Sequence, residues 1–100
     1  EEYFERQWVK SLLAMAVDQC REVLDPVSFE IFEAYDLAPD SGITYAQLAA
    51  KHGVTEATVT NRLAAARRRF REIAIALVRD VTVSDREFRS EVRALFGIDV

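Results

Sequence analysis

Residues 44–63 read TYAQLAAKHGVTEATVTNRL, and this stretch decides how the chain folds. It begins with Thr44, a residue that often caps a helix, and then runs without a helix breaker as far as Gly53. A glycine at this point ends a helix at low cost, because it readily adopts a left-handed backbone. Thr55 is a plausible cap for a second helix, and Glu56 suits the positive end of its dipole. The pattern predicts two helices joined by a short turn.

The residues around this turn have the spacing of a helix-turn-helix. Ala49 is small where the first helix must approach the second, and Gly53 follows four residues later, at the turn. Val54 is expected to be a buried anchor, and Val59 is expected to fill the core from the second helix. Because the second helix is also basic, we expect a DNA-binding helix-turn-helix over residues 44–72. A plain helical hairpin is the alternative.

Apolar periodicity extends the helical pattern along the whole chain. Asp25 followed by proline opens another helix, Ser84 to Glu87 form a capping box, and Gly97 ends the last helix. We therefore expect an all-α fold in a single helical domain, residues 1–100, with an extra C-terminal helix after the helix-turn-helix. The five expected helices cover residues 2–24, 27–36, 45–52, 56–80 and 84–96. The expected core side chains include Trp8, Leu12, Met15, Ala16, Phe29, Ile31, Phe32, Tyr35, Val59, Leu63, Ala66, Phe70, Ile73, Leu77, Val81, Phe88, Val92, Leu95 and Phe96.

Composition excludes several classes of protein. The chain has 100 residues, half of them hydrophobic, with three glycines and two prolines, which argues against an all-β or disordered chain. A single cysteine and a single histidine provide neither a disulfide framework nor the usual zinc cluster. No nucleophile has a base at motif spacing, and no glycine-rich phosphate loop occurs. We therefore expect that the chain is not an enzyme and that it binds neither a cofactor nor a metal ion. With no signal peptide or membrane span in the sequence, we expect a cytoplasmic location.

Charge is unevenly distributed along the chain. The net charge is −4, but residues 1–40 hold ten acidic and three basic residues, whereas residues 54–79 hold six arginines and two glutamates. Clustered positive charge matters more to a polyanion than the total charge does. The basic segment thus favours a nucleic-acid partner. The acidic segment could act in solubility, shield the basic helix or bind a basic partner.

One face of the basic helix is expected to point outward. If Val59, Leu63, Ala66 and Phe70 face the core, the outward line is Ala57, Asn61, Ala64 and Arg68. An asparagine amide can pair with adenine N6 and N7 in the major groove. The flanking Thr58 and Thr60 can reach a phosphate or a thymine methyl group, whereas Arg68 and Arg71 are better placed for phosphates. Arg62, Arg67 and Arg69 lie nearer the edge of the core.

These residues resemble region 4 of bacterial RNA polymerase sigma factors of the extracytoplasmic-function group. The resemblance covers residues 3–72, and its most specific part is Thr58-Val59, Arg62-Leu63 and Ala66-Arg67. It implies recognition of the promoter −35 element in double-stranded DNA and docking on the β flap of the RNA polymerase core. An anti-sigma factor is a further possible partner. The family meets DNA at positions that correspond here to Tyr45, Thr58, Thr60, Asn61, Ala64 and Ala65.

The sequence also departs from this family. Members often carry a basic residue at the positions of Thr60 and Ala65, and serine at the position of Asn61. Fewer phosphate contacts lower affinity and flatten its salt dependence. The acidic first third, together with Ala64 and Ala65, favours an alternative, a protein-interaction module that docks on the flap or on an anti-sigma factor with little DNA affinity. A response-regulator output domain is a third interpretation. Tyr45 could equally be an aromatic at the edge of the core.

Overall fold

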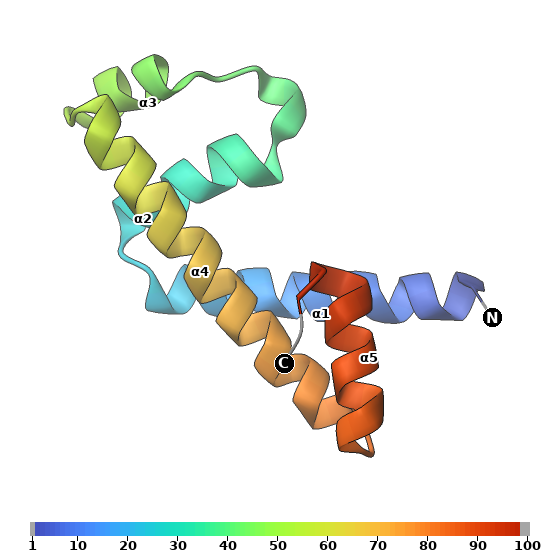
Figure 1. The fold of residues 1–100 in the computed structure, drawn as a ribbon. Helices are drawn as coiled ribbons and strands as arrows, with labels where there is room; N and C mark the ends of the chain where they lie inside the picture. Colours follow the sequence, from blue (N-terminus) through green and yellow to red (C-terminus); the bar gives the residue numbers. More distant parts are fainter. Residues whose placement is uncertain (1, 99–100) are drawn as a thin grey trace. The chain divides into compact units, whose positions relative to one another are not determined.

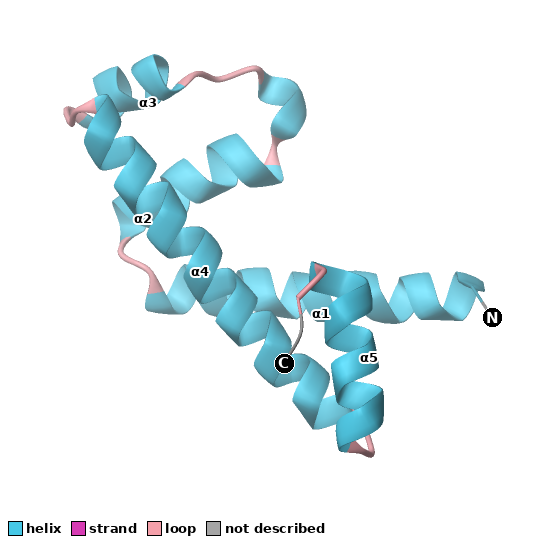
Figure 2. Cartoon of the chain, viewed as in Figure 1, coloured by secondary structure: helices cyan, strands magenta, loops and turns pink. Residues whose placement is uncertain are grey.

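The computed structural model describes residues 2–98, and the side chains of residues 7–98. Within this part of the chain the fold is all-α, as predicted, with five α-helices and no strand (Figures 1 and 2). The helices are α1 (Glu2–Val23), α2 (Pro26–Phe32), α3 (Tyr45–His52), α4 (Glu56–Val81) and α5 (Asp85–Phe96). A π-helical turn, η1 (Glu33–Leu37), and a 3₁₀ turn, η2 (Pro39–Ser41), separate α2 from α3.

The chain divides into two compact units. Unit 1 comprises Glu1–Gln19 and Phe70–Val100, and unit 2 comprises Cys20–Arg69. Unit 2 contains the predicted helix-turn-helix segment as far as residue 69, and unit 1 contains α5. That residues 1–100 form a single domain stays a prediction.

Local caps position α3 and the start of α4 within unit 2. The Gln47 N–H donates to Thr44 Oγ1 at 3.1 Å, and the Thr44 N–H donates to Gln47 Oε1 at 2.9 Å, so that α3 begins with a complete capping box. Gly53 has φ of 66°, and the Val54 N–H donates to the Ala49 carbonyl at 3.0 Å. In Figure 1 the short turn formed by Gly53 to Thr55 joins α3 directly to α4. The two helices and the turn are confirmed; a DNA-binding role stays a prediction.

The core of unit 2 contains all the side chains that the periodicity places there except Tyr35, which is only half-buried. Leu48, Val59 and Leu63 are fully buried, and so are Ile31, Cys20 and Ala66. Ala49 is buried, consistent with a small residue where two helices meet, but Val54 is only half-buried, so it is a weaker anchor than predicted. The hydrophobic residues of α2 complete this core.

The second predicted helix, residues 27–36, is wrong in its last part. The α-helical hydrogen bonding ends at Phe32, and the wider η1 turn carries Tyr35 and Asp36. Those two side chains contact Tyr45 and Arg67, which come from α3 and α4. These contacts are tertiary, and the local apolar pattern of residues 27–36 contains no sign of them.

Unit 1 has a core of its own. Leu12 and Ala16 of α1, Ile73, Ala74 and Val78 of α4, and Phe88 and Val92 of α5 are buried in it. The Glu87 N–H donates to Ser84 Oγ at 3.1 Å, which caps α5, and Gly97 ends it with φ of 67°. Of the predicted capping box only this half is formed in the described structure.

Two residues predicted to be core in unit 1 are not. Met15 is 52% exposed and Val81 is 51% exposed. Five more are half-buried: Trp8, Phe70, Leu77, Leu95 and Phe96. Helical periodicity places a side chain on the correct side of its helix, but burial also needs a neighbour to cover it.

Candidate nucleic-acid interface

The outward face of α4 in unit 2 lies where the helical spacing predicted. Ala57, Asn61, Ala64 and Arg68 are all exposed, as are the flanking Thr60 and Ala65, while Thr58 is half-buried. Because Val59, Leu63 and Ala66 are buried on the opposite side, this face is free of core packing. Arg71 is exposed as well, but it belongs to unit 1.

Asn61 is the residue of this face best suited to read a base. Among the described residues its side-chain amide has no hydrogen-bond partner, and it is exposed. Both its oxygen and its NH₂ group are therefore available. An amide in this state can make the paired hydrogen bonds that adenine offers in the major groove.

The two threonine hydroxyls differ in what they can still donate. Thr55 Oγ1 donates to Thr58 Oγ1 at 3.0 Å, so Thr58 accepts there and keeps its own hydrogen for another acceptor. Thr60 Oγ1 donates to the Glu56 carbonyl at 3.1 Å. A phosphate oxygen only accepts hydrogen bonds, so Thr58 suits a phosphate, whereas Thr60 offers mainly its methyl group.

Two arginines of the basic segment are already paired inside unit 2. Arg67 Nε and Nη2 donate to Asp36 Oδ2 and Oδ1 at 2.6 and 2.8 Å, a bidentate pair. Hydrogen bonding to Asp36 raises the pKa of the Arg67 guanidinium, and the Asp36 charge adds to the effect. Arg62 Nη1 donates to Asp25 Oδ2 at 3.0 Å and to Ser28 Oγ at 2.9 Å. These pairs reduce the positive charge that a polyanion would meet.

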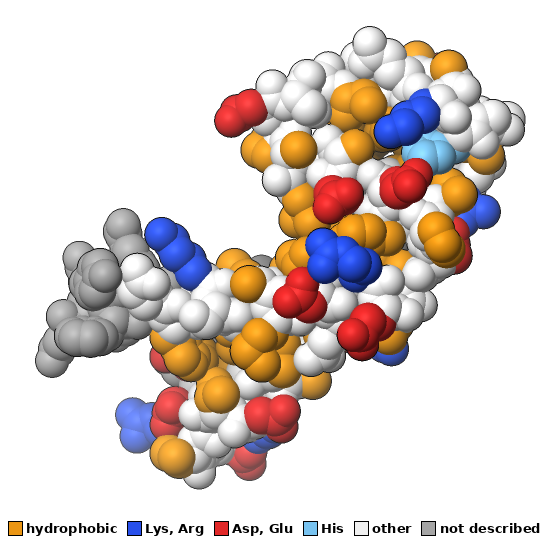
Figure 3. All heavy atoms as spheres, turned by 180° about the vertical axis from the view of Figure 1, so that it is seen from behind, with side chains coloured by type: hydrophobic (Ala, Val, Ile, Leu, Met, Phe, Trp, Pro, Cys, Tyr) orange, Lys and Arg blue, Asp and Glu red, His pale blue; other side chains and the backbone are white. Residues whose placement is uncertain are grey.

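Arg68 differs from these two arginines. It is exposed, and the described residues offer it no ion pair or hydrogen bond. It is therefore the arginine of unit 2 whose charge is open to a phosphate. On the face that Figure 3 shows, acidic and basic side chains are interspersed with hydrophobic ones.

Tyr45 packs within unit 2. Its ring lies 4.8 Å from the ring of Tyr35, centroid to centroid, at an interplanar angle of 59°. The guanidinium of Arg67 lies 5.9 Å from the Tyr35 centroid, so that the two tyrosines and the Arg67–Asp36 pair form one cluster. Tyr45 is half-buried by this packing. Its contact with a DNA backbone stays a prediction.

Asp25 has a second role that its position in the sequence did not reveal. Asp25 is the N-cap of α2, as predicted, because its Oδ2 accepts a hydrogen bond from the Ser28 N–H at 3.1 Å. The same oxygen also accepts a hydrogen bond from Arg62 Nη1. The Ser28 side chain and, to a smaller extent, the Ser28 backbone lower the pKa of the Asp25 carboxyl below its usual 3.8 by hydrogen bonding. The positive charge of Arg62 lowers this pKa further. Asp25 thus ties α2 to α4.

Replacing Asp25 with alanine is expected to lower the free energy of unfolding near pH 7 by about 0.5–2 kcal/mol, the usual cost of losing an N-cap. Because the pKa of the folded carboxyl lies below its unfolded value, this stabilisation is present above about pH 4 and disappears as the carboxyl is protonated at lower pH. Urea unfolding of the unchanged protein and of the Asp25→Ala variant, at neutral and at acidic pH, measures the difference in their free energies of unfolding. The exposed Asp40, replaced with alanine, is the control. A difference that stays undiminished as the pH is lowered until the carboxyl is protonated would contradict the role of the ionised carboxyl.

The single histidine and the single cysteine lie inside unit 2. The His52 side chain is 7% exposed, its Nδ1 lies 3.7 Å from Glu30 Oε2, and its Nε2 is buried without a partner among the described atoms. Cys20 is fully buried, and this burial raises the pKa of its thiol, which makes it a poor nucleophile. In the described part of the chain no group of three His, Cys, Asp or Glu residues could hold a metal ion.

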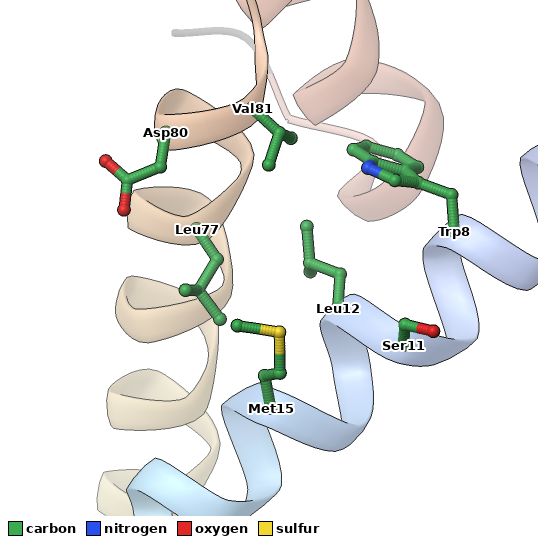
Figure 4. Close-up of a pocket in the computed structure, with 7 residues that line it drawn as sticks. All are labelled: Trp8, Ser11, Leu12, Met15, Leu77, Asp80 and Val81. Carbon is green, nitrogen blue, oxygen red and sulfur yellow. The ribbon is translucent and has the colours of Figure 1, made fainter.

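Unit 1 contains an apolar groove of about 210 Å³ that the sequence did not predict. Figure 4 shows Leu12 and Met15 of α1 pointing toward Leu77 and Val81 of α4, while the Asp80 carboxylate points outward. Trp8 and Ser11 complete the lining. The exposure of Met15 and Val81 noted above arises at this groove.

None of the described helices is both long enough and apolar enough to cross a membrane. Comparison of the chain with protein-family models, with curated proteins and with solved structures gives no match.

Proposed function

We propose that this chain is a DNA-binding domain of the sigma factor region 4 type, which recognises a promoter −35 element and docks on the RNA polymerase β flap. The observation that carries the proposal is the free amide of Asn61 on the exposed face of α4. It lies in the second turn of a helix that follows α3 after a three-residue connection, the arrangement of a recognition helix. The polymerase and the promoter are inferred as partners from the resemblance over residues 3–72.

Each residue of this face would contribute in its own way. Asn61 would pair with an adenine, and the Thr58 hydroxyl would donate to a phosphate. Ala64 and Ala65 are small, so the helix could lie close to the floor of the groove, where their methyl groups could contact thymine methyls. Thr60 would offer its methyl group in the same way. Arg68 would hold the backbone.

The ion pairs of unit 2 bear on the strength of binding. Arg62 and Arg67 are engaged with Asp25 and Asp36, so few guanidinium groups remain for phosphates. Each phosphate contact contributes about 0.9 to the slope of log affinity against log salt. We therefore expect modest affinity and a shallow salt dependence from this face, and a larger share of specificity from Asn61.

Replacing Arg68 with alanine is expected to weaken binding to all duplexes alike and to reduce the salt slope by about 0.9, the share of one phosphate contact. Fluorescence anisotropy with a random duplex pool and with a sequence selected from it, from low to physiological salt, measures both effects. Lys10, replaced with alanine, removes the same charge from the exposed surface of α1 and is the control. Absence of binding at low salt would refute the proposal for this chain.

The apolar groove of unit 1 favours a second function, a protein-interaction module with little DNA affinity. Val83 is 91% exposed, so this unit presents large apolar side chains on its surface beyond those of the groove. In this case the chain would bind an isolated fragment of the β flap without DNA. The Asn61→Ala and Arg68→Ala variants would bind that fragment as well as the unchanged protein does.

A further inference from the structure

Helix α5 presents three arginines on one exposed face. Arg86, Arg89 and Arg93 follow one another at spacings of three and four residues, and with Ser90 they line a hollow of about 310 Å³. At 100° per residue the three side chains fall within one narrow sector of the helix. Like charges at these spacings repel one another, and an anion in the hollow would relieve that repulsion.

The acidic residues of α5 leave Arg86 and Arg89 unneutralised, whereas Arg93 already takes part in another interaction. Asp85 is the acid nearest to it around the helix, and its Oδ1 already accepts from Arg79 Nη1 at 2.7 Å. Glu87 and Glu91 lie on a different side of the helix by the same spacing. Within the described structure, Arg86 and Arg89 have no ion pair or hydrogen bond.

The apolar face of α5 is used inside unit 1. Phe88 and Val92 are buried, and the guanidinium of Arg79 lies 3.7 Å from the centroid of the Phe88 ring. A helix that lies in a membrane surface must offer its apolar face to the lipid. Because the apolar face of α5 is covered, its arginine face is suited to an anion in solution.

We propose that the arginine face of α5, formed by Arg86, Arg89, Ser90 and Arg93, binds the phosphate backbone of double-stranded DNA. Arg93 lies seven positions after Arg86 along the helix, a rise of about 10 Å at 1.5 Å per residue. Such a row fits consecutive charges along a backbone better than it fits one isolated phosphate. Guanidinium groups bind phosphate through paired N–H donors, and a serine hydroxyl can donate to the same oxygens. This surface lies in unit 1 and would contact DNA independently of the α4 face.

The test is the salt dependence of binding to a short duplex of mixed sequence, measured by fluorescence anisotropy. Arg89→Gln is expected to reduce the salt slope by about 0.9, and Arg86→Gln with Arg89→Gln by about 1.8. Lys10→Gln, which changes the net charge as Arg89→Gln does, should leave the slope unchanged. Arg86→Lys with Arg89→Lys keeps both charges and should retain the slope. Circular dichroism melting of each variant confirms that it folds.

Other results would overturn the proposal. An unchanged slope in the folded double glutamine variant would exclude phosphate binding by α5. If a polyglutamate peptide of the same charge as the duplex competes for the protein as well as the duplex does, the partner of this face is an acidic protein. If the protein binds vesicles of anionic lipid as tightly as it binds the duplex, the partner is a membrane. If only Arg68→Ala flattens the slope, this inference fails and the α4 proposal stands; if only the α5 variants do, the α4 proposal fails.

Discussion

Replacing Leu63 with alanine is expected to lower the free energy of unfolding by about 2–5 kcal/mol. Leu63 is fully buried in unit 2, one helical turn beyond the equally buried Val59. Truncation removes three carbon atoms from this core and leaves a cavity that the neighbouring helices can fill only in part. For a domain of this size such a loss is a large share of a total stability of about 5–15 kcal/mol.

Urea unfolding followed by circular dichroism measures this loss. Leu37→Ala is the matched control, because Leu37 belongs to the same unit but is 39% exposed, and we expect it to cost much less. The single tryptophan, Trp8, lies in unit 1, so its fluorescence also reports whether unit 1 unfolds together with unit 2. An equal cost for the two leucine variants would contradict the burial of Leu63.

Replacing Asn61 with alanine is expected to weaken binding to the selected duplex by about 1–3 kcal/mol and to relax discrimination at one base pair. Binding to unrelated duplexes should change little, because a lost base contact does not alter the phosphate contacts. Folding should be unaffected or slightly improved, since no described residue bonds to the amide and alanine is the better helix former. Reduced binding would therefore not arise from unfolding.

Anisotropy titrations against the selected duplex and its single-base variants measure the effect of Asn61→Ala. Gln19→Ala removes an exposed amide from α1 and should leave all of these affinities unchanged. If Asn61→Ala weakens every duplex equally, Asn61 does not read a base. If no affinity changes, the α4 face does not contact DNA through this residue, and the interaction-module alternative gains support.

Several features of the candidate interface were predictable because they depend on residues close together in the sequence. The spacing of Val59, Leu63 and Ala66 predicted which side of α4 is buried, and therefore that Asn61 and Arg68 are exposed. The charge available on that face was not predictable. Arg67 is paired with Asp36, 31 residues away, and Arg62 with Asp25, 37 residues away.

The sequence by itself determined the helices and most of their ends. Caps such as Thr44 with Gln47, Ser84 with Glu87, and Gly53 act over a few residues, because a helix end satisfies its free N–H and carbonyl groups with nearby atoms. Only the tertiary structure decided which arginines are paired, where α2 gives way to a π-helical turn, and that Met15 and Val81 line an open groove. These features depend on which helices meet. Two segments distant along the chain contribute to each such contact, and neither segment alone contains the information.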